Sequence, residues 1–344
     1  ERISNDIKDK FNLIPTLADE DDYRKIETSF LCEYLGSEHA EAIQSFARKY
    51  AIKETERATY QAMEALIHNL NTMHSRAGAQ VPFSSINYGT DTSPEGRMVI
   101  KNILLAEEAG LGNGETPIFP IHIFKVKEGV NYNPEDPNYD LFKLACKVSA
   151  KRLFPNFSFI DAPFNLQYYR PDRPETEIAY MGCRTRVIGN VHDPSREIVT
   201  GRGNLSFTSI NLPRLAIRAN HDIDKFYTLL NEMMDLVIEQ LIHRFNIQAK
   251  KLVRNYPFLM EQGIWIDSDK LGLDDEVGEV LKHGSLSVGF IGLAETLKAL
   301  IGKHHGESEE ARELGYEIIS TMRKRVDEES ERTKLNFSLF ATPA

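Results

Sequence analysis

Short, almost entirely apolar segments alternate with longer amphipathic segments along most of this sequence, and this alternation most constrains the fold. Residues 118–126 are nearly all apolar or aromatic, as expected of a strand buried on both faces of a parallel sheet. Apolar residues at three- and four-residue steps elsewhere predict helices. Because strands alternate with helices, the sequence predicts an α/β fold in which the strands pair largely in parallel.

The predicted elements are read from these two periodicities. Helices are expected at residues 54–74, 94–111, 140–151, 224–245, 293–300 and 307–334, and strands at 81–92, 118–126, 157–161, 286–291 and 335–340. The first strand is expected to run into a polar loop. Residues 171–214 are rich in turn-forming residues and are predicted to form the loop region of an active site.

Composition limits the class of protein. The chain has 344 residues and a net charge of −10, which argues against general binding to nucleic acid because no basic stripe is available to replace the counterions of phosphate. Hydrophobic residues make up 41% and charged residues 27%, which is ordinary for a globular protein. No apolar run is long enough to cross a membrane and no leader is visible, so a cytoplasmic protein without a membrane partner is expected.

The three cysteines are Cys32, Cys146 and Cys183, and their wide spacing predicts neither a metal site nor a disulfide framework. We expect Cys32 and Cys146 to be packed among apolar residues. Cys183 differs, because it follows Gly182 and has turn-forming residues on both sides, which predicts a thiol at the tip of a loop. By spacing alone, a small buried hydrophobic role for Cys183 stays open.

Several motifs resemble one family. They are Met181-Gly182-Cys183-Arg184, Asn204, residues 209–214 (Ser-Ile-Asn-Leu-Pro-Arg), 80–92, 119–124, 289–295 and 340–344. From about residue 54 to the end, in the same order, the chain resembles the anaerobic (class III) ribonucleoside-triphosphate reductases. Glu stands first and Ala344 ends inside a motif, so we expect a fragment of a longer protein.

The resemblance implies a fold and a reaction. The fold is a ten-stranded α/β barrel of the glycyl-radical enzyme and ribonucleotide reductase type, with two antiparallel five-stranded halves and the Cys183 loop inside. Residues 1–344 would then form a single catalytic barrel fragment. The reaction is the reduction of ribonucleoside triphosphates to deoxyribonucleoside triphosphates, in which Cys183 carries a transient thiyl radical that abstracts a ribose hydrogen, sheltered from solvent and oxygen.

The resemblance also implies cofactors that this sequence lacks. A glycyl radical in a C-terminal domain oxidises the cysteine, and a radical S-adenosylmethionine iron–sulfur activase installs it. A zinc site accompanies that domain. We find no counterpart of the glycine, of the zinc cysteines or of the family's second active-site cysteine, so the fragment alone is expected to be inactive.

Several further site residues follow from the resemblance. Asn204 matches an Asn of members that use formate, whereas members that use a thiol reductant tend to carry an acid, and a neutral amide does not repel an anion. Met181 is expected beside the sulfur. Ser84, Ser85 and Asn87 offer hydroxyl and amide groups for substrate. A simpler role for Asn204, as the cap of a turn after Gly203, stays open.

The region 54–80 is expected to serve regulation. In the family, a helix at this place lies at a homodimer interface, where a deoxynucleoside triphosphate or ATP sets substrate preference. Arg76 and Gln80, in the turn that follows, are the expected effector contacts. Two other classes remain open: another glycyl-radical enzyme, either an acyltransferase or a dehydratase, and a nucleotide-sensing dimer module without catalysis.

Overall fold

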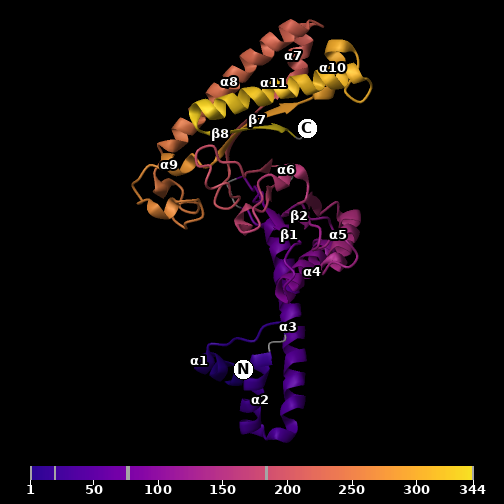
Figure 1. Cartoon of the computed structure of the whole chain (residues 1–344), viewed down its shortest axis with the longest axis vertical. Helices are drawn as coiled ribbons and strands as arrows, with labels where there is room; N and C mark the ends of the chain where they lie inside the picture. Colours follow the sequence, from indigo (N-terminus) through magenta and orange to yellow (C-terminus); the bar gives the residue numbers. More distant parts are fainter. Residues whose placement is uncertain (1, 19–20, 75–77, 183–184, 343–344) are drawn as a thin grey trace. The chain divides into compact units, whose positions relative to one another are not determined.

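The computed structural model describes residues 2–18, 21–74, 78–182 and 185–342. Contacts divide the chain into two compact units. The first unit comprises Glu1–Gln167 with Tyr180–Arg184, and the second comprises Tyr168–Ala179 with Thr185–Ala344. Each unit has its own parallel sheet (Figure 1).

The first unit holds six helices and four strands among its described residues. The helices are α1 (Arg2–Phe11), α2 (Asp21–Leu35), α3 (Ser37–Thr72), α4 (Pro94–Ala109), α5 (Tyr139–Arg152) and α6 (Pro163–Leu166), and the strands are β1 (Ser85–Tyr88), β2 (Ile121–Val126), β3 (Asn156–Phe159) and β4 (Tyr180–Met181). Strands β1, β2 and β3 pair in parallel and in chain order. Helices α4 and α5 supply the crossovers that parallel neighbours require.

The sheet of the first unit is held by an apolar core between β2 and these two helices. Ile100 and Leu104 of α4 pack with Phe124 of β2 and with Leu141 and Val148 of α5. Helix α4 begins where the sequence supplies a cap, because the Ser93 hydroxyl accepts a hydrogen bond from the Gly96 amide and Pro94 needs no hydrogen-bond acceptor at the first position.

A buried polar row crosses the same core. The Tyr88 hydroxyl lies 2.9 Å from Nδ1 of His122, and Nε2 of His122 lies 3.3 Å from Oε2 of Glu107. His122 and Glu107 are fully buried. Burial, followed by the nearby Glu107, raises the pKa of Tyr88 well above its ordinary value, so this hydroxyl stays protonated beside the imidazole.

The second unit is organised in the same way. Its strands are β5 (Thr185–Arg186), β6 (Asn204–Asn211), β7 (Ser285–Ile291) and β8 (Asn336–Ala341); its helices are α7 (Leu212–Ala219), α8 (Ile223–Ala249), α9 (Gly278–Leu281), α10 (Leu293–Ile301) and α11 (Glu309–Thr333), with 3₁₀ turns at Pro174–Thr176, Val253–Asn255 and Ser268–Lys270. Strands β6, β7 and β8 pair in parallel. Helices α8 and α11 run along the sheet (Figure 1).

The register of this sheet separates an apolar face from a polar one. Leu286 and Val288 of β7 and Phe337 of β8 lie on the face that packs against the helices. The intervening residues of β7, Ser285 and Ser287, lie on the opposite face because successive side chains of a strand alternate. The second unit therefore has a sheet with a helix-covered face and a face lined by hydroxyl groups.

The α/β prediction with parallel pairing is confirmed, and most predicted elements lie within a few residues of the observed ones. Helix α3 begins at Ser37, well before the expected residue 54. Residues 204–214 were predicted as loop, and this is wrong: they form β6 and the start of α7. Cys146 was predicted to be packed, but it is exposed on α5, because it lies on the face of that helix away from Leu141 and Val148. Within the described ranges, no helix is long and apolar enough to cross a membrane.

Candidate active site

Cys183 and Arg184 lie outside the described residues, but the segment that leads to them is described. Asn87 of β1 makes two hydrogen bonds to the backbone of Tyr180: its Nδ2 donates to the Tyr180 carbonyl at 2.8 Å, and its Oδ1 accepts from the Tyr180 amide at 2.9 Å. The Ser85 hydroxyl accepts from the Gly182 amide at 3.0 Å. Alternate side chains of β1 therefore hold the backbone up to the residue before Cys183.

Gly182 has a conformation that explains why glycine stands there. Its φ is 60°, in the left-handed region that other residues seldom adopt. A Cβ atom at this position would also lie 3.1 Å from Cε1 of Phe83. Backbone conformation and crowding together disfavour any side chain immediately before the cysteine.

The remaining predicted residues of the first unit have different surroundings. The Ser84 Oγ is buried and has no hydrogen-bond partner among the described atoms. Met181 lies in β4 and is half-buried. Ser85 and Asn87, which we predicted as substrate contacts, have the backbone of the cysteine segment as their partners.

Asn204 begins β6 on the polar face of the sheet in the second unit. Its Nδ2 donates to the Ser287 Oγ, and the Ser287 Oγ lies 2.8 Å from the Ser338 Oγ. The Oδ1 of Asn204 is buried and has no partner in the described part of the chain. Asn204 is therefore a strand residue whose side chain bonds across the sheet, and the alternative that it caps a turn is wrong.

A second hydroxyl pair lies further along the same face. The Ser209 Oγ and the Thr342 Oγ1 lie 2.6 Å apart. Gly289 of β7 makes room for them, since an added Cβ would lie 2.3 Å from Thr342 and 2.5 Å from Ser209. The rings of Phe207, aligned with Ser287, and of Phe340, aligned with Gly289, lie with their centroids 5.9 Å apart. This face presents hydroxyl, amide and aromatic groups together.

Sequence reasoning missed Ser287 and Ser338. The signal was present, because Ser285 and Ser287 alternate with Leu286 and Val288 and thus mark one polar face of an otherwise apolar strand. Which residue of another strand meets Ser287 depends on the sheet register, and no local pattern specifies that register.

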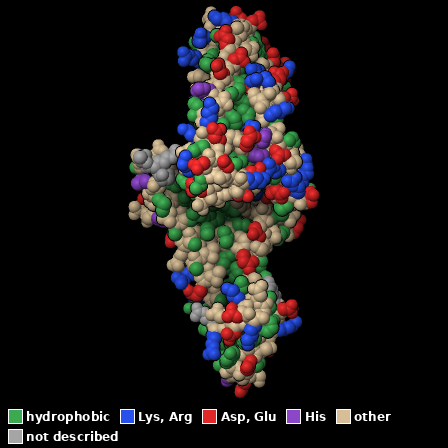
Figure 2. Space-filling view, turned by 90° about the vertical axis from the view of Figure 1, so that its left-hand side faces the viewer, with side chains coloured by type: hydrophobic (Ala, Val, Ile, Leu, Met, Phe, Trp, Pro, Cys, Tyr) green, Lys and Arg blue, Asp and Glu red, His purple; other side chains and the backbone are tan. Residues whose placement is uncertain are grey.

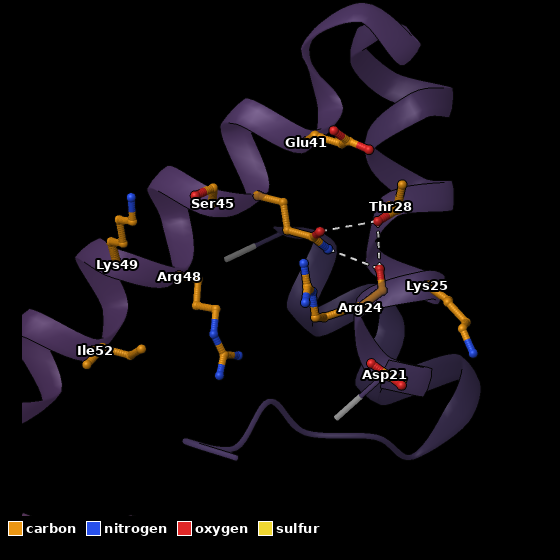
Figure 3. A pocket seen from close by; sticks show the side chains of 10 residues that line it. Asp21, Arg24, Lys25, Thr28, Glu41, Ser45, Arg48, Lys49 and Ile52 are labelled. Carbon is orange, nitrogen blue, oxygen red and sulfur yellow. Dashed lines mark hydrogen bonds between the residues drawn. The ribbon is translucent and has the colours of Figure 1, made fainter. Parts of the chain in front are cut away.

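The predicted effector residues follow α3 in the sequence. Arg76 lies outside the described residues, and Gln80 is exposed. A hollow of about 640 Å³ lies further back, between α2 and the first half of α3. The guanidinium groups of Arg24 and Arg48 point into it (Figure 3), and Lys25, Lys49, Asp21 and Glu41 also line it.

Charge elsewhere on the surface is mixed. Figure 2 shows Lys and Arg side chains interspersed with Asp and Glu side chains over the face in view. Charged side chains of the helices form ion pairs one helical turn apart, such as Arg323 with Asp327. No group of three or more His, Cys, Asp or Glu side chains that suits a metal ion occurs in the described ranges.

These features define a mixed α/β scaffold that holds the backbone segment before Cys183 and presents a polar sheet face. The chain belongs to the anaerobic ribonucleoside-triphosphate reductase family, whose sequence model matches residues 30–344. This match favours a reductase over an acyltransferase or dehydratase of the glycyl-radical type.

Curated relatives agree with the family model. The chain is 34% identical over 304 residues to the anaerobic ribonucleoside-triphosphate reductase of Salmonella typhimurium, and 36% identical over 305 residues to that of Enterobacteria phage T4. Each match covers 87% of this chain but only 41% and 47% of the relative, respectively. The chain thus spans less than half the length of these proteins.

Solved structures share the fold. The anaerobic ribonucleotide reductase from Thermotoga maritima with citrate in the active site has a TM-score of 0.55 at 14% identity, over 97% of this chain and 61% of that one. The same enzyme in complex with dATP and CTP also has a TM-score of 0.55, over 85% of this chain and 48% of that one. At this identity the likeness shows the fold alone.

Proposed function

We propose that this chain is the catalytic part of an anaerobic ribonucleoside-triphosphate reductase, and that its two units contribute strands to one ten-stranded barrel. The observation that carries the proposal is the fixation of the Cys183 segment by Ser85 and Asn87. A reacting sulfur gains from being held in one geometry, since orientation supplies a large share of rate enhancement. Ser85 and Asn87 then serve to hold the segment before Cys183, and Ser84 remains a candidate substrate contact.

In the proposed reaction, a thiyl radical on Cys183 takes the 3′ hydrogen of the ribose and becomes a thiol. The 2′ hydroxyl then leaves as water with one added proton, and two electrons from the reductant complete the exchange. With formate the balance is ribonucleotide plus formate plus a proton giving deoxyribonucleotide, carbon dioxide and water. Asn204 supplies a neutral polar group, and Met181 lies two residues before Cys183 in the sequence.

The oxidising equivalent would come from elsewhere in the parent protein. A glycyl radical, installed by a radical S-adenosylmethionine activase, would supply the one-electron oxidation of the Cys183 thiol. The zinc site of the family would likewise belong to the parent protein. The residues of this chain orient the groups that take part in the reaction. Strand β1 holds the cysteine segment, and β6 carries Asn204.

Nucleotide effectors and a homodimer complete the proposal. We place the effector site on region 54–80 with Arg76 and Gln80, close to the predicted dimer helix. The cations around the hollow between α2 and α3 offer a further place for a triphosphate. A nucleotide-sensing module without catalysis would use the same region.

One experiment distinguishes a reductase from a nucleotide-sensing module without catalysis. The parent protein is activated anaerobically, and formation of deoxynucleotide from a ribonucleoside triphosphate and formate is measured for the wild type and for Cys183→Ala. The matched control is Cys146→Ala, an exposed cysteine on α5. We expect Cys183→Ala to abolish turnover and to leave effector binding unchanged. Retained turnover in Cys183→Ala would overturn the assignment, and effector binding without turnover in the wild type would favour the sensing module.

A further inference from the structure

Two hydrogen bonds link three side chains on the polar face of the second unit. The amide nitrogen of Asn204 can only donate, so the Ser287 hydroxyl accepts from it. The Ser287 proton is then free to donate to the Ser338 oxygen, 2.8 Å away. Ser287 thus connects the Asn204 amide nitrogen to Ser338.

The hydrogen bond from the amide nitrogen determines which atom Asn204 offers to a ligand. Its Nδ2 is engaged by Ser287, while its Oδ1 is buried without a partner among the described atoms. A buried carbonyl oxygen that lacks a donor costs free energy, and a ligand that donates to it recovers that cost. The matching chemical group is a hydroxyl, whereas a carboxylate anion carries no proton to give.

We propose that Ser287 and Ser338 are positioning residues that lock the Asn204 amide with its carbonyl oxygen presented to a hydroxyl group of the substrate ribose. The inference rests on the proposed function and extends it: Asn204 acts as an acceptor, and two serines on neighbouring strands set its orientation. If Ser287 loses its hydroxyl, the amide is free to rotate and to present its NH₂ group instead.

The test uses the parent protein. Deoxynucleotide formation is compared for Ser287→Ala, Ser338→Ala and Ser285→Ala, each with and without Asn204→Ala. Ser285 is the matched control, because it lies on the same face of the same strand and its buried hydroxyl has no partner among the described residues. Loss of one hydrogen bond predicts a decrease of about 5- to 10-fold for Ser287→Ala. We expect a smaller decrease for Ser338→Ala and a change below about 2-fold for Ser285→Ala.

The double variants separate positioning from general support of the fold. If Ser287 acts through Asn204, Ser287→Ala causes no further loss in the Asn204→Ala background. Ser287→Thr, which keeps the hydroxyl, should restore turnover. The proposal is overturned if Ser287→Ala behaves like Ser285→Ala, or if it lowers the rate equally with and without Asn204.

A second measurement does not depend on turnover. If the wild-type parent makes no deoxynucleotide, the proposed function fails, but crystal structures of the parent and of its Ser287→Ala variant still decide this inference. It requires the contact between Asn204 Nδ2 and Ser287 in the wild type and a changed amide orientation in the variant. An amide that keeps its orientation in the variant refutes the positioning role.

Discussion

Asn87 and Tyr180, 93 positions apart in the sequence, are joined by a matched pair of hydrogen bonds between one side-chain amide and one backbone residue. Only an amide side chain can both donate and accept in this way, since a carboxylate has no donor and a hydroxyl is too short to reach both groups. The strand that carries Asn87 thus fixes the backbone three residues before Cys183.

Removal of this pair should slow the reaction. Asn87→Ala loses two hydrogen bonds of about 1 kcal/mol each, which corresponds to about 30-fold in the rate of deoxynucleotide formation by the parent protein. Asn87→Asp should be as harmful, because a carboxylate oxygen would face the Tyr180 carbonyl. Asn113→Ala, which removes a loop amide bonded to Glu115, is the control and should retain its rate. An unchanged rate in Asn87→Ala would remove the main support for a fixed cysteine segment.

Gly182 should not tolerate a side chain. Gly182→Ala puts an alanine in the left-handed backbone region, with its Cβ 3.1 Å from Phe83. The conformation costs about 1–2 kcal/mol of free energy. We expect a decrease of roughly 10-fold in the rate. The double variant with Phe83→Ala should recover only part of it, because the backbone strain remains. Gly112→Ala, where nothing lies within 4 Å of the added Cβ, serves as the control. Equal rates for the Gly182 and Gly112 variants would contradict this account.

Local sequence patterns predicted the helices and the parallel class, because α4, α5, α8 and α11 carry continuous apolar stripes. They did not predict which strand residues meet. The pairing of Asn87 with Tyr180 and of Asn204 with Ser287 depends on contacts between distant segments. The prediction for helix α3 is too short for a different reason: the first half of this helix contacts α2 but buries only Ala40 and Gln44, so its apolar periodicity is weak.

The buried pair of Glu107 and His122 should be important for stability. His122→Leu leaves Glu107 unpaired in the core, which typically costs about 3–5 kcal/mol in the free energy of unfolding. Replacement of both residues by apolar ones should recover much of this loss. The control is Lys101→Ala, which breaks an exposed pair with Glu56 and should cost less than about 1 kcal/mol. Urea unfolding of the parent protein measures these changes, and similar costs for the two single variants would show that the buried pair is unimportant.

His283 should make the stability of the protein depend on pH. Burial first, and then the positive charge of Arg196, lowers the pKa of this imidazole below its ordinary value. The groups around it are Asn190, whose Nδ2 lies 3.1 Å from Nδ1, Arg196 and Asp267, at 3.3 and 3.7 Å from Nε2, the ring of His192, and Arg202. With Asn190 as donor to Nδ1, the neutral ring is the form that fits.

The sign of the effect follows from proton binding. Below pH 6.5 the unfolded chain binds a proton at this histidine more readily than the folded chain does, so stability is present above that pH and is lost as the pH falls toward the lowered folded pKa. We therefore expect the urea midpoint of the parent protein to decrease between pH 8 and pH 5.5. His283→Gln should flatten this decrease, whereas His305→Gln, at an exposed site, should not. If the two variants show the same pH dependence as the wild type, protonation of His283 does not limit stability in acid, and the network around it tolerates a charged ring.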